Sequence, residues 1–191
     1  MAHDSIVNPL ARSHRSVVHM LRAAAENWPT REALVCGDDR LTYSEYFNAV
    51  AGLADALKKR GASGQRVALI MTNSVDICIA MFAAHAAGAQ VVPINPLYTA
   101  TELVPILTDA APLVLLHDNA PRESVNKVLD QVDIKHVIAI GLETNQRAFD
   151  YQAPALPEPL PAPESLATLQ YTGGTTGVSK GVDLTHQQIS I

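Results

Sequence analysis

Short apolar runs recur along the middle of the chain, and a segment compatible with a helix separates each run from the next. The runs lie at residues 67–71, 90–93, 113–117 and 136–141, so they begin about every 23 residues, as strands that alternate with helices do. Such alternation is typical of a parallel sheet with crossover helices. Leucine-rich solenoids have similar spacing, but their LxxLxL pattern is missing here. The pattern therefore predicts an α/β fold with a mostly parallel sheet.

A capping box marks the start of a helix ahead of these runs. Thr42 and Glu45 stand three positions apart, and an apolar stripe with helical spacing follows them. The basic run 58–60 falls in the expected last turn, where its positive charges meet the negative end of the helix dipole. Gly61 can then adopt the left-handed conformation that ends the helix. The basic run is therefore expected to be structural.

A second capping box, formed by Thr99 and Glu102, predicts a helix that runs toward Asp109. Pro105 has no backbone N–H to donate, so it is expected near the first turn of this helix. That expectation leaves open a cap at Thr101 instead of Thr99.

Turn residues and prolines mark the segments on either side of the predicted sheet. Residues 33–36 and 40–42 flank a Gly-Asp-Asp turn, which predicts a hairpin at the edge of the domain. From 154 to 163, five of ten residues are proline, which excludes a regular helix and favours an extended strap. The sheet is thus expected to stop at this strap and to resume after it.

Composition narrows the class of protein. Of 191 residues, 48% are hydrophobic and 17% charged, with a formal net charge of -5, as in soluble globular domains. The acidic balance argues against a nucleic-acid partner, because binding to phosphate backbones requires clustered Lys and Arg. The first 20 residues contain no apolar stretch, so no signal peptide is predicted and a cytoplasmic protein is expected. The uncharged stretch 77–101 contains polar residues and prolines, which predicts a buried helix, a turn and a buried strand rather than a membrane span.

Isolated cysteines and histidines give no further site. Cys36 and Cys78 have no CxxC spacing, so no zinc or thioredoxin-like chemistry is predicted and both are expected to be free thiols. His85 lies in an Ala-rich helical pattern and is expected in the core rather than on a metal ion. His186 follows the glycine-rich loop described below and is assigned to the start of a helix.

Three aspartates, Asp76, Asp109 and Asp118, lie at the ends of predicted elements. No two carboxylates share a spacing that suggests acid–base catalysis. We therefore expect these side chains to be solvated or to cap helices.

A glycine- and threonine-rich loop between two strand-like segments, 165–171 and 182–184, carries the strongest chemical signal. Glycines let backbone N–H groups point at an anion, hydroxyl groups add donors, and a lysine adds positive charge. The candidate nucleotide-binding residues are Thr172, Gly173, Gly174, Thr175, Thr176, Gly177 and Lys180. Neither GxxxxGK[ST] nor GxGxxG occurs in the loop, which excludes two familiar phosphate loops. Composition alone also allows an ordinary hairpin with an exposed lysine, and Thr185 is the expected N-cap of a following helix.

The loop resembles the phosphate-binding signature of the AMP-forming adenylating superfamily, Tyr-Thr-Ser-Gly-Thr-Thr-Gly-x-Pro-Lys-Gly. Residues 171–181 match eight of its ten fixed positions, with Gly173 in place of the serine and Ser179 in place of the proline. Upstream segments, 66–73 and 95–99 among them, also resemble the N-terminal lobe of this superfamily. The segment 95–99 and the double glycine most resemble bacterial long-chain fatty acyl-CoA synthetases.

The resemblance implies an activity, its cofactors and a division of the chain. Members of this superfamily join ATP and a carboxylic acid as an acyl-adenylate with release of pyrophosphate, and acyl-CoA synthetases then transfer the acyl group to CoA. ATP, Mg²⁺ and CoA are therefore expected, with Lys180 holding polyphosphate rather than acting as a base. Residues 1–191 would form the N-terminal portion of the large domain, with a strap at 148–164 and the phosphate-loop segment at 165–191.

Other motifs of the superfamily have no counterpart in the chain. The acidic adenine- and ribose-site motifs and the C-terminal catalytic lysine do not occur before Ile191. The chain is therefore expected to be an N-terminal fragment, inactive alone, that packs against a missing C-terminal part of the same protein. An aryl or amino acid adenylating enzyme with a carrier-protein acceptor stays open, as does a non-catalytic nucleotide- or partner-binding module. The resemblance is compatible with a cytoplasmic enzyme and with peripheral contact at the inner membrane.

Overall fold

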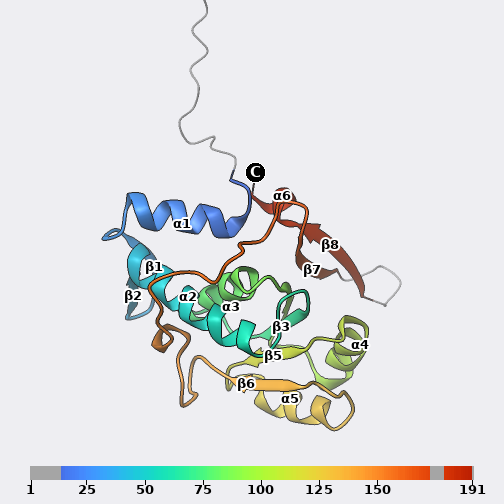
Figure 1. Cartoon of the computed structure of the whole chain (residues 1–191). Coiled ribbons are helices and arrows are strands. Elements are labelled where there is room, and N and C mark those ends of the chain that lie inside the picture. The colour runs from blue at the N-terminus through green and yellow to red at the C-terminus, as the bar shows by residue number, and fades with distance from the viewer. Residues whose placement is uncertain (1–13, 173–178, 191) are drawn as a thin grey trace, which may run out of the picture.

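A six-stranded sheet forms the centre of the computed structural model, which describes residues 14–172 and 179–190 (Figure 1). The strands are β3 (Arg66–Ile70), β4 (Gln90–Ile94), β5 (Val114–His117), β6 (His136–Ala139), β7 (Leu166–Thr172) and β8 (Lys180–Thr185). Their order is β6-β5-β3-β4-β7-β8, and all neighbours are parallel except β7 and β8, which are antiparallel. The predicted α/β class with a mostly parallel sheet is confirmed.

Helices cover both faces of this sheet (Figure 1). One face packs against α1 (Val17–Asn27), α2 (Tyr43–Lys59) and α3 (Val75–Ala86), and the other against α4 (Ala100–Ala110) and α5 (Arg122–Leu129). Successive residues of a strand point to opposite faces, so in β3 Val67 joins the first core and Ala68 the second. The central strands are buried on both faces, which explains why each reads as a continuous apolar run.

The segment before the sheet forms the predicted hairpin. β1 (Glu32–Cys36) and β2 (Asp39–Thr42) pair antiparallel in a separate two-stranded sheet. Gly37 in the turn has a φ of +59°, in the left-handed region that favours glycine. The hairpin is confirmed, and its two strands begin one residue earlier than the sequence predicts.

The predicted capping box starts α2. The Thr42 hydroxyl accepts a hydrogen bond from the backbone N–H of Glu45 at 3.3 Å, and the Glu45 carboxylate accepts one from the Thr42 N–H at 2.8 Å. Gly61, just beyond the helix, has a φ of +82°, as the left-handed cap requires.

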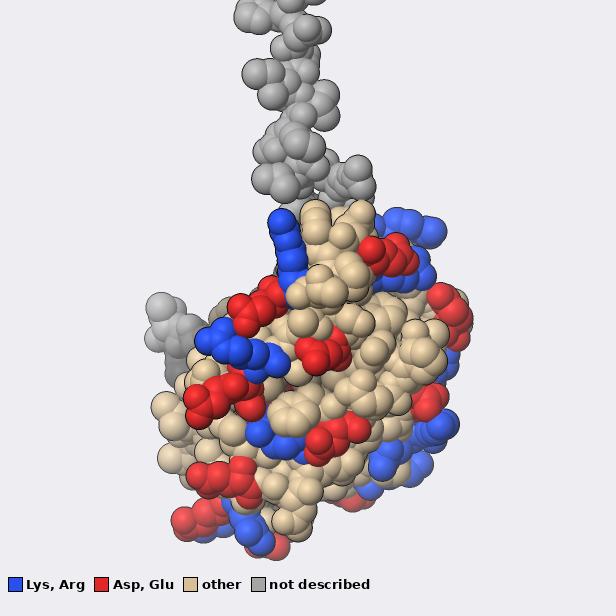
Figure 2. Space-filling view, turned by 90° about the vertical axis from the view of Figure 1, so that its left-hand side faces the viewer, with Lys and Arg blue, Asp and Glu red and all other residues tan. Residues whose placement is uncertain are grey.

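The basic run at the end of α2 contacts groups of the protein itself. Lys59 pairs with Asp55 one turn earlier at 2.6 Å, and Lys58 Nζ donates to the carbonyl oxygen of Glu158 at 2.5 Å. Figure 2 shows the left-hand side of the molecule in Figure 1, where Lys and Arg side chains alternate with Asp and Glu. The contacts therefore agree with a structural role for this run.

α4 begins where the capping box predicts, but Pro105 does not lie in its first turn. The Glu102 carboxylate accepts hydrogen bonds from the N–H and the hydroxyl of Thr99 at 2.8 and 2.7 Å, so Thr99 and not Thr101 is the N-cap. The helix starts at Ala100, which puts Pro105 inside its second turn. The prediction for Pro105 was wrong, because the buried apolar face of α4 keeps the helical frame although one backbone hydrogen bond is lost.

Residues 154–163 form neither helix nor strand, as their prolines predict. A short 3₁₀ helix, η1 (Ala148–Asp150), comes before them. The backbone of Gln152 then lies directly against α2, where a Cβ added to Gly52 would stand only 2.4 Å from the Gln152 nitrogen. The missing side chain of Gly52 therefore makes room for the start of this segment.

After the proline-rich segment, β7 and β8 form an antiparallel hairpin at one end of the sheet (Figure 1). α6 (His186–Ile189) follows, and its N-cap Thr185 accepts the N–H of Gln188 at 3.3 Å. Both strands, the cap and the helix are confirmed. β8 begins at Lys180, two positions before the predicted strand.

The stretch 77–101 forms most of α3, a turn and β4, as predicted. Gly88 in the turn has a φ of +77°. Within the described ranges, no helix has both the length and the apolar character needed to cross a membrane. Cys36 and Cys78 are free thiols, the first exposed and the second partly buried.

Candidate nucleotide-binding site

Two places at one edge of the sheet could receive a ligand, because the carboxyl ends of parallel strands meet there. The first is the switch point between β3 and β5: from β3 the chain moves to β4 on one side, and from β5 it moves to β6 on the other. The second is the end of β7, from which the glycine-rich loop leaves. Open α/β sheets commonly bind ligands at a switch point.

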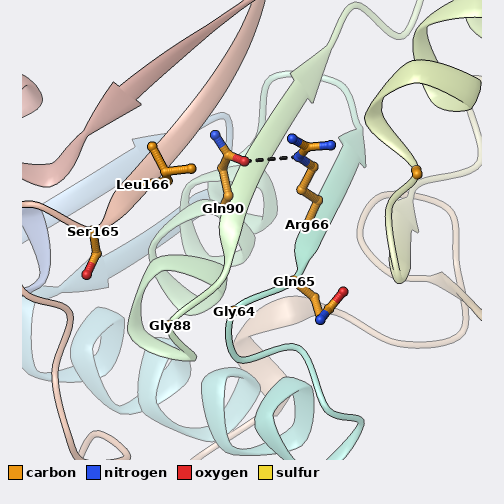
Figure 3. A pocket seen from close by; sticks show the side chains of 8 residues that line it. Gly64, Gln65, Arg66, Gly88, Gln90, Ser165 and Leu166 are labelled. Carbon is orange, nitrogen blue, oxygen red and sulfur yellow. Dashed lines mark hydrogen bonds between the residues drawn. The ribbon is translucent and has the colours of Figure 1, made fainter.

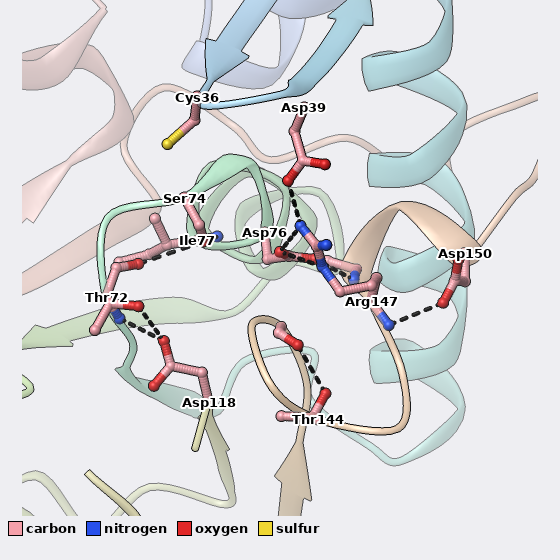
Figure 4. A network of polar contacts seen from close by, with 12 residues as sticks. Cys36, Asp39, Thr72, Ser74, Asp76, Ile77, Asp118, Thr144, Arg147 and Asp150 are labelled. Atoms are coloured by element: carbon pink, nitrogen blue, oxygen red, sulfur yellow. Dashed lines mark hydrogen bonds and ion pairs between the residues drawn. The ribbon is translucent and has the colours of Figure 1, made fainter. Parts of the chain in front are cut away.

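Here a buried side chain closes the switch point. Asp118, at the end of β5, is fully buried and accepts hydrogen bonds from the N–H and the hydroxyl of Thr72, at 2.7 and 2.5 Å (Figure 4). Thr72 follows β3, so the carboxylate joins the ends of the two strands. The N–H of Ala120 donates to the other carboxylate oxygen at 3.2 Å. The expectation that Asp118 is solvated or caps a helix was wrong, because these donors replace water around a buried carboxylate.

Asp76, next to the switch point, also differs from the expectation. It is fully buried, and its carboxylate accepts hydrogen bonds from Nε of Arg147 at 2.8 Å and from the N–H of Ala148 at 2.6 Å. Arg147 also pairs with Asp39 of β2 at 2.5 Å, which joins the hairpin to α3 (Figure 4). The hydrogen bond to Asp76 raises the pKa of Arg147 above its ordinary value. These groups satisfy one another, so this part of the edge is structural.

The second place presents exposed polar groups. Thr172 and Lys180 face each other as the last pair of the β7–β8 ladder, which we call the loop rung. Both are exposed, and the Thr172 hydroxyl lies 3.5 Å from the carbonyl oxygen of Lys180. The candidates Gly173, Gly174, Thr175, Thr176 and Gly177 lie outside the described residues. The structure thus brings Thr172 and Lys180 together at the carboxyl edge of the sheet.

A groove of about 880 Å³ opens beside the loop rung. Its walls are α4 with Tyr98 ahead of it on one side, and Tyr171 with residues 179–181 on the other. Lys180 is the one Lys or Arg among the described residues that line it, and the described ranges contain no carboxylate within 4 Å of its ammonium group. The Lys180 charge is therefore available to an anion.

Another pocket, of about 470 Å³, lies at the opposite edge of the sheet (Figure 3). Arg66 and Gln90, the first residues of β3 and β4, stand in it, and Nε of Arg66 donates to the Gln90 side chain at 3.0 Å. Nη1 of Arg66 donates to the Ala110 carbonyl at 2.9 Å, so the guanidinium group is engaged by the protein itself. This pocket does not share the chemistry of the loop rung.

Beyond β8, a buried pair of histidines holds the hairpin on the helical layer. The ring of His186 packs edge-on against that of His85 in α3, with centroids 5.1 Å apart. Burial lowers the pKa of His85 to about 3 and that of His186 to about 4. Nδ1 of each ring has no hydrogen-bond partner in the described structure. His85 is a core histidine as predicted, and His186 contacts this core.

A profile of the family described as "AMP-binding enzyme" matches residues 21–191. The chain belongs to the AMP-binding enzyme family. Its predicted membership of the adenylating superfamily is thereby confirmed.

Family relatives with different names and activities match the same region. The long-chain-fatty-acid–CoA ligase FadD13 of Mycobacterium tuberculosis is 33% identical over 181 residues, which cover 92% of this chain and 36% of the ligase. Tyrocidine synthase 3 of Brevibacillus parabrevis is 30% identical over 174 residues, which cover 91% of this chain and 2% of the synthase. The crystal structure of the N-terminal domain of FACL13 from M. tuberculosis matches with a TM-score of 0.81 and 30% identity, over 91% of this chain and 45% of that one.

The chain thus spans about a third of the ligase and a far smaller share of the synthase. The family membership applies to the chain. The acid, the acceptor and the residues that bind the nucleotide are matters for proposal.

Proposed function

We propose that this chain carries the polyphosphate-binding part of an ATP-dependent ligase that joins a fatty acid to CoA through an acyl-adenylate. The observation that supports this most is the loop rung: Thr172 and Lys180 stand exposed at the two ends of a glycine- and threonine-rich segment, with an open groove beside them. The proposed site is Thr172, Gly173, Gly174, Thr175, Thr176, Gly177 and Lys180. The strap at 148–164 and the phosphate-loop segment at 165–191 belong to the same proposal.

The chemistry assigns this site a holding role. A carboxylate oxygen of the acid attacks the α-phosphorus of ATP, and the bond to the bridging oxygen breaks as pyrophosphate leaves with the electron pair. Negative charge then accumulates on the β- and γ-phosphates, so backbone N–H groups, hydroxyls and the Lys180 ammonium group would lower the barrier by stabilising it. Lys180 needs no change of protonation in this step.

Mg²⁺ accompanies ATP in the proposal. Within the described ranges, no three or more His, Cys, Asp or Glu side chains gather as a metal cluster. A loop rich in hydroxyls but without carboxylates still suits this ion, because Mg²⁺ keeps several waters and binds largely through substrate phosphates. When bound, the ion neutralises part of the phosphate charge, and Lys180 orients the same phosphates.

The relatives leave two candidate acids and acceptors. A fatty acid and CoA are supported by the 33% identity to a long-chain-fatty-acid–CoA ligase. An amino acid with a carrier-protein acceptor is supported by the 30% identity to tyrocidine synthase 3 and is the second candidate. Adenylation with release of pyrophosphate is common to both proposals, so the loop rung would have the same role in each.

The test is ATP–pyrophosphate exchange by the longer protein that contains this chain. Separate reactions receive a long-chain fatty acid, an aromatic acid or a mixture of amino acids, each with and without CoA. Exchange with the fatty acid and a CoA thioester as product are expected. Exchange with amino acids alone, without a thioester to CoA, would favour the second candidate. The absence of exchange with every acid would reject adenylation and leave the non-catalytic binding module.

A further inference from the structure

We propose that a hydrogen bond between Tyr171 and Asp109 positions the loop rung for adenylation; this inference rests on the function proposed above. The Tyr171 hydroxyl donates to the Asp109 carboxylate at 2.5 Å. Tyr171 directly precedes Thr172 on β7, and Asp109 lies in the last turn of α4, on the other side of the groove. Both are positioning residues, because they would act on the phosphates only through Thr172 and Lys180.

Asp109, the acceptor of this hydrogen bond, is held in place without help from Tyr171. Ala110, the next residue of α4, is fully buried, and its carbonyl accepts the hydrogen bond from Arg66 at the start of β3. Ala111 ends the helix with a φ of +43°, and its N–H donates to the Leu107 carbonyl at 2.9 Å. The last turn of α4 is therefore fixed to the sheet, and the carboxylate of Asp109 projects from a rigid base.

The position of Tyr171, the donor of this hydrogen bond, is also restricted. Tyr171 is partly buried and packs against the core on the α4 side of the sheet. Its partner in the ladder is Gly181, where an added Cβ would lie 3.4 Å from Cζ of Tyr171 and 2.8 Å from Cδ1 of Leu169. The missing side chain at Gly181 therefore leaves space for Leu169, and the tyrosine ring lies within van der Waals contact of the same position. Burial and the hydrogen bond to Asp109 raise the pKa of Tyr171 above its ordinary value, so the phenol remains a donor at neutral pH.

This bond acts where the hairpin has little other support. β7 pairs with β4 where Thr168 of β7 lies opposite Val91 of β4, near the base of the hairpin. In the described part of the chain, three hydrogen bonds join side chains of β7 and β8 to side chains outside the hairpin: Gln90 to Asp183 at 2.7 Å, Thr185 to Gln188 of α6 at 3.2 Å, and Tyr171 to Asp109. The bond from Tyr171 is the one adjacent to the loop rung. Its loss should let the rung move relative to α4.

The experiment measures the two half-reactions of the longer protein for four variants: Tyr171→Phe, Asp109→Ala, Asp109→Asn and the double variant Tyr171→Phe/Asp109→Ala. Tyr171→Phe and Asp109→Ala should each slow ATP–pyrophosphate exchange about 10-fold, because misplaced phosphates lose orientation. Thioester formation from supplied acyl-adenylate should be unchanged. Asp109→Asn keeps an oxygen that accepts the phenol proton, so its rate should stay within about twofold of the original. The double variant should be no slower than either single variant, because one bond is lost in all three.

The outcomes separate this inference from the proposed function. If the unaltered protein shows no exchange with any acid, the proposed function is wrong. If the protein is active and Tyr171→Phe exchanges at the original rate, the positioning role is wrong. Equal losses in both half-reactions, or losses that multiply in the double variant, would show a general structural effect and would also overturn it. The exposed Asp109 carboxylate makes misfolding of its variants an unexpected result, and unfolding by urea checks it.

Discussion

Two places along the sheet's carboxyl edge use polar side chains in opposite ways. Between β3 and β5, Asp118 and Asp76 are fully buried, and Thr72 and Arg147 supply their donors. At the end of β7, the loop rung is exposed and a groove of about 880 Å³ lies next to it. The same strand geometry thus gives a sealed junction at one place and an open one at the other.

The difference shows why position in a fold does not by itself identify a site. The switch point is the place where an open α/β sheet usually binds its ligand, yet here its polar groups form hydrogen bonds and ion pairs with one another. The end of β7 lies two strands from that point in the sheet order, on the far side of β4. An exposed lysine that has no carboxylate partner among the described residues and lies next to open space, rather than topology, points to the ligand.

The largest expected effect tests the sealed region. Asp76→Ala removes both the ion pair to Arg147 and the acceptor of the Ala148 N–H, and should lower the free energy of unfolding by about 3 kcal/mol. Asp39→Ala, which removes the partly exposed partner of the same arginine, should cost less than about 1 kcal/mol. Urea unfolding of the two variants measures the contrast. Similar losses would show that the buried aspartate is not the main support of this region.

A pH titration tests how the hairpin is anchored beyond β8. The folded pKa of His85, about 3, lies below the unfolded value near 6.5, so the unfolded chain binds protons first as the pH falls. The contribution of neutral His85 to the free energy of unfolding is therefore fully present above pH 6.5 and is lost as the pH falls toward the folded pKa. His85→Gln should reduce the slope of unfolding free energy against pH between 6 and 4 by about 1.4 kcal/mol per pH unit. If His85→Gln leaves the slope unchanged, the two proteins differ in unfolding free energy by the same amount at pH 4 and at pH 7. That result would contradict a neutral, buried His85.

The smallest effect concerns a helix cap near the sealed region. Thr42→Ala removes the hydroxyl that accepts the Glu45 N–H, and should destabilise the protein by about 1 kcal/mol. Thr101→Ala is the matched change on the groove, at an exposed threonine, and should alter stability by less than about 0.5 kcal/mol. Thermal unfolding distinguishes the two. A larger loss for Thr101→Ala would mean that the groove wall is more tightly supported than the cap.

Local sequence signals predicted most of the fold. The apolar runs predicted the four strands β3 to β6, and the capping boxes at Thr42 and Thr99 predicted the starts of two helices, because each depends on residues a few positions apart. Pro105 was misplaced because burial of the rest of α4 outweighs one lost hydrogen bond. α1 was not predicted at all, since its start was considered only as part of an N-terminal stretch without a signal peptide.

Contacts between distant residues were beyond the sequence. Thr72 and Asp118 are 46 positions apart, and Arg147 and Asp39 are 108 apart, so no spacing rule connects them. The full burial of Asp76 and Asp118 also reversed the expectation that these two aspartates are solvated or cap helices, whereas Asp109 is exposed. Thr172 and Lys180 were identified from composition and resemblance, but the groove and the Tyr171 bond emerged only when the fold brought α4 against the hairpin. The sequence thus identifies candidate chemical groups, and the tertiary structure determines which of them remain exposed to a ligand.

The most direct test of the account is the effect of Lys180→Ala on the two half-reactions of the longer protein, with Lys59→Ala as the matched control. Lys59 is exposed and pairs with Asp55 on α2, away from the groove. Lys180→Ala should slow adenylation by about two orders of magnitude, equivalent to about 3 kcal/mol, while thioester formation from supplied acyl-adenylate and folding stability change little. Lys59→Ala should leave both half-reactions unchanged. Equal losses of the two half-reactions in Lys180→Ala, or no loss of adenylation, would contradict polyphosphate binding at the open end of the sheet.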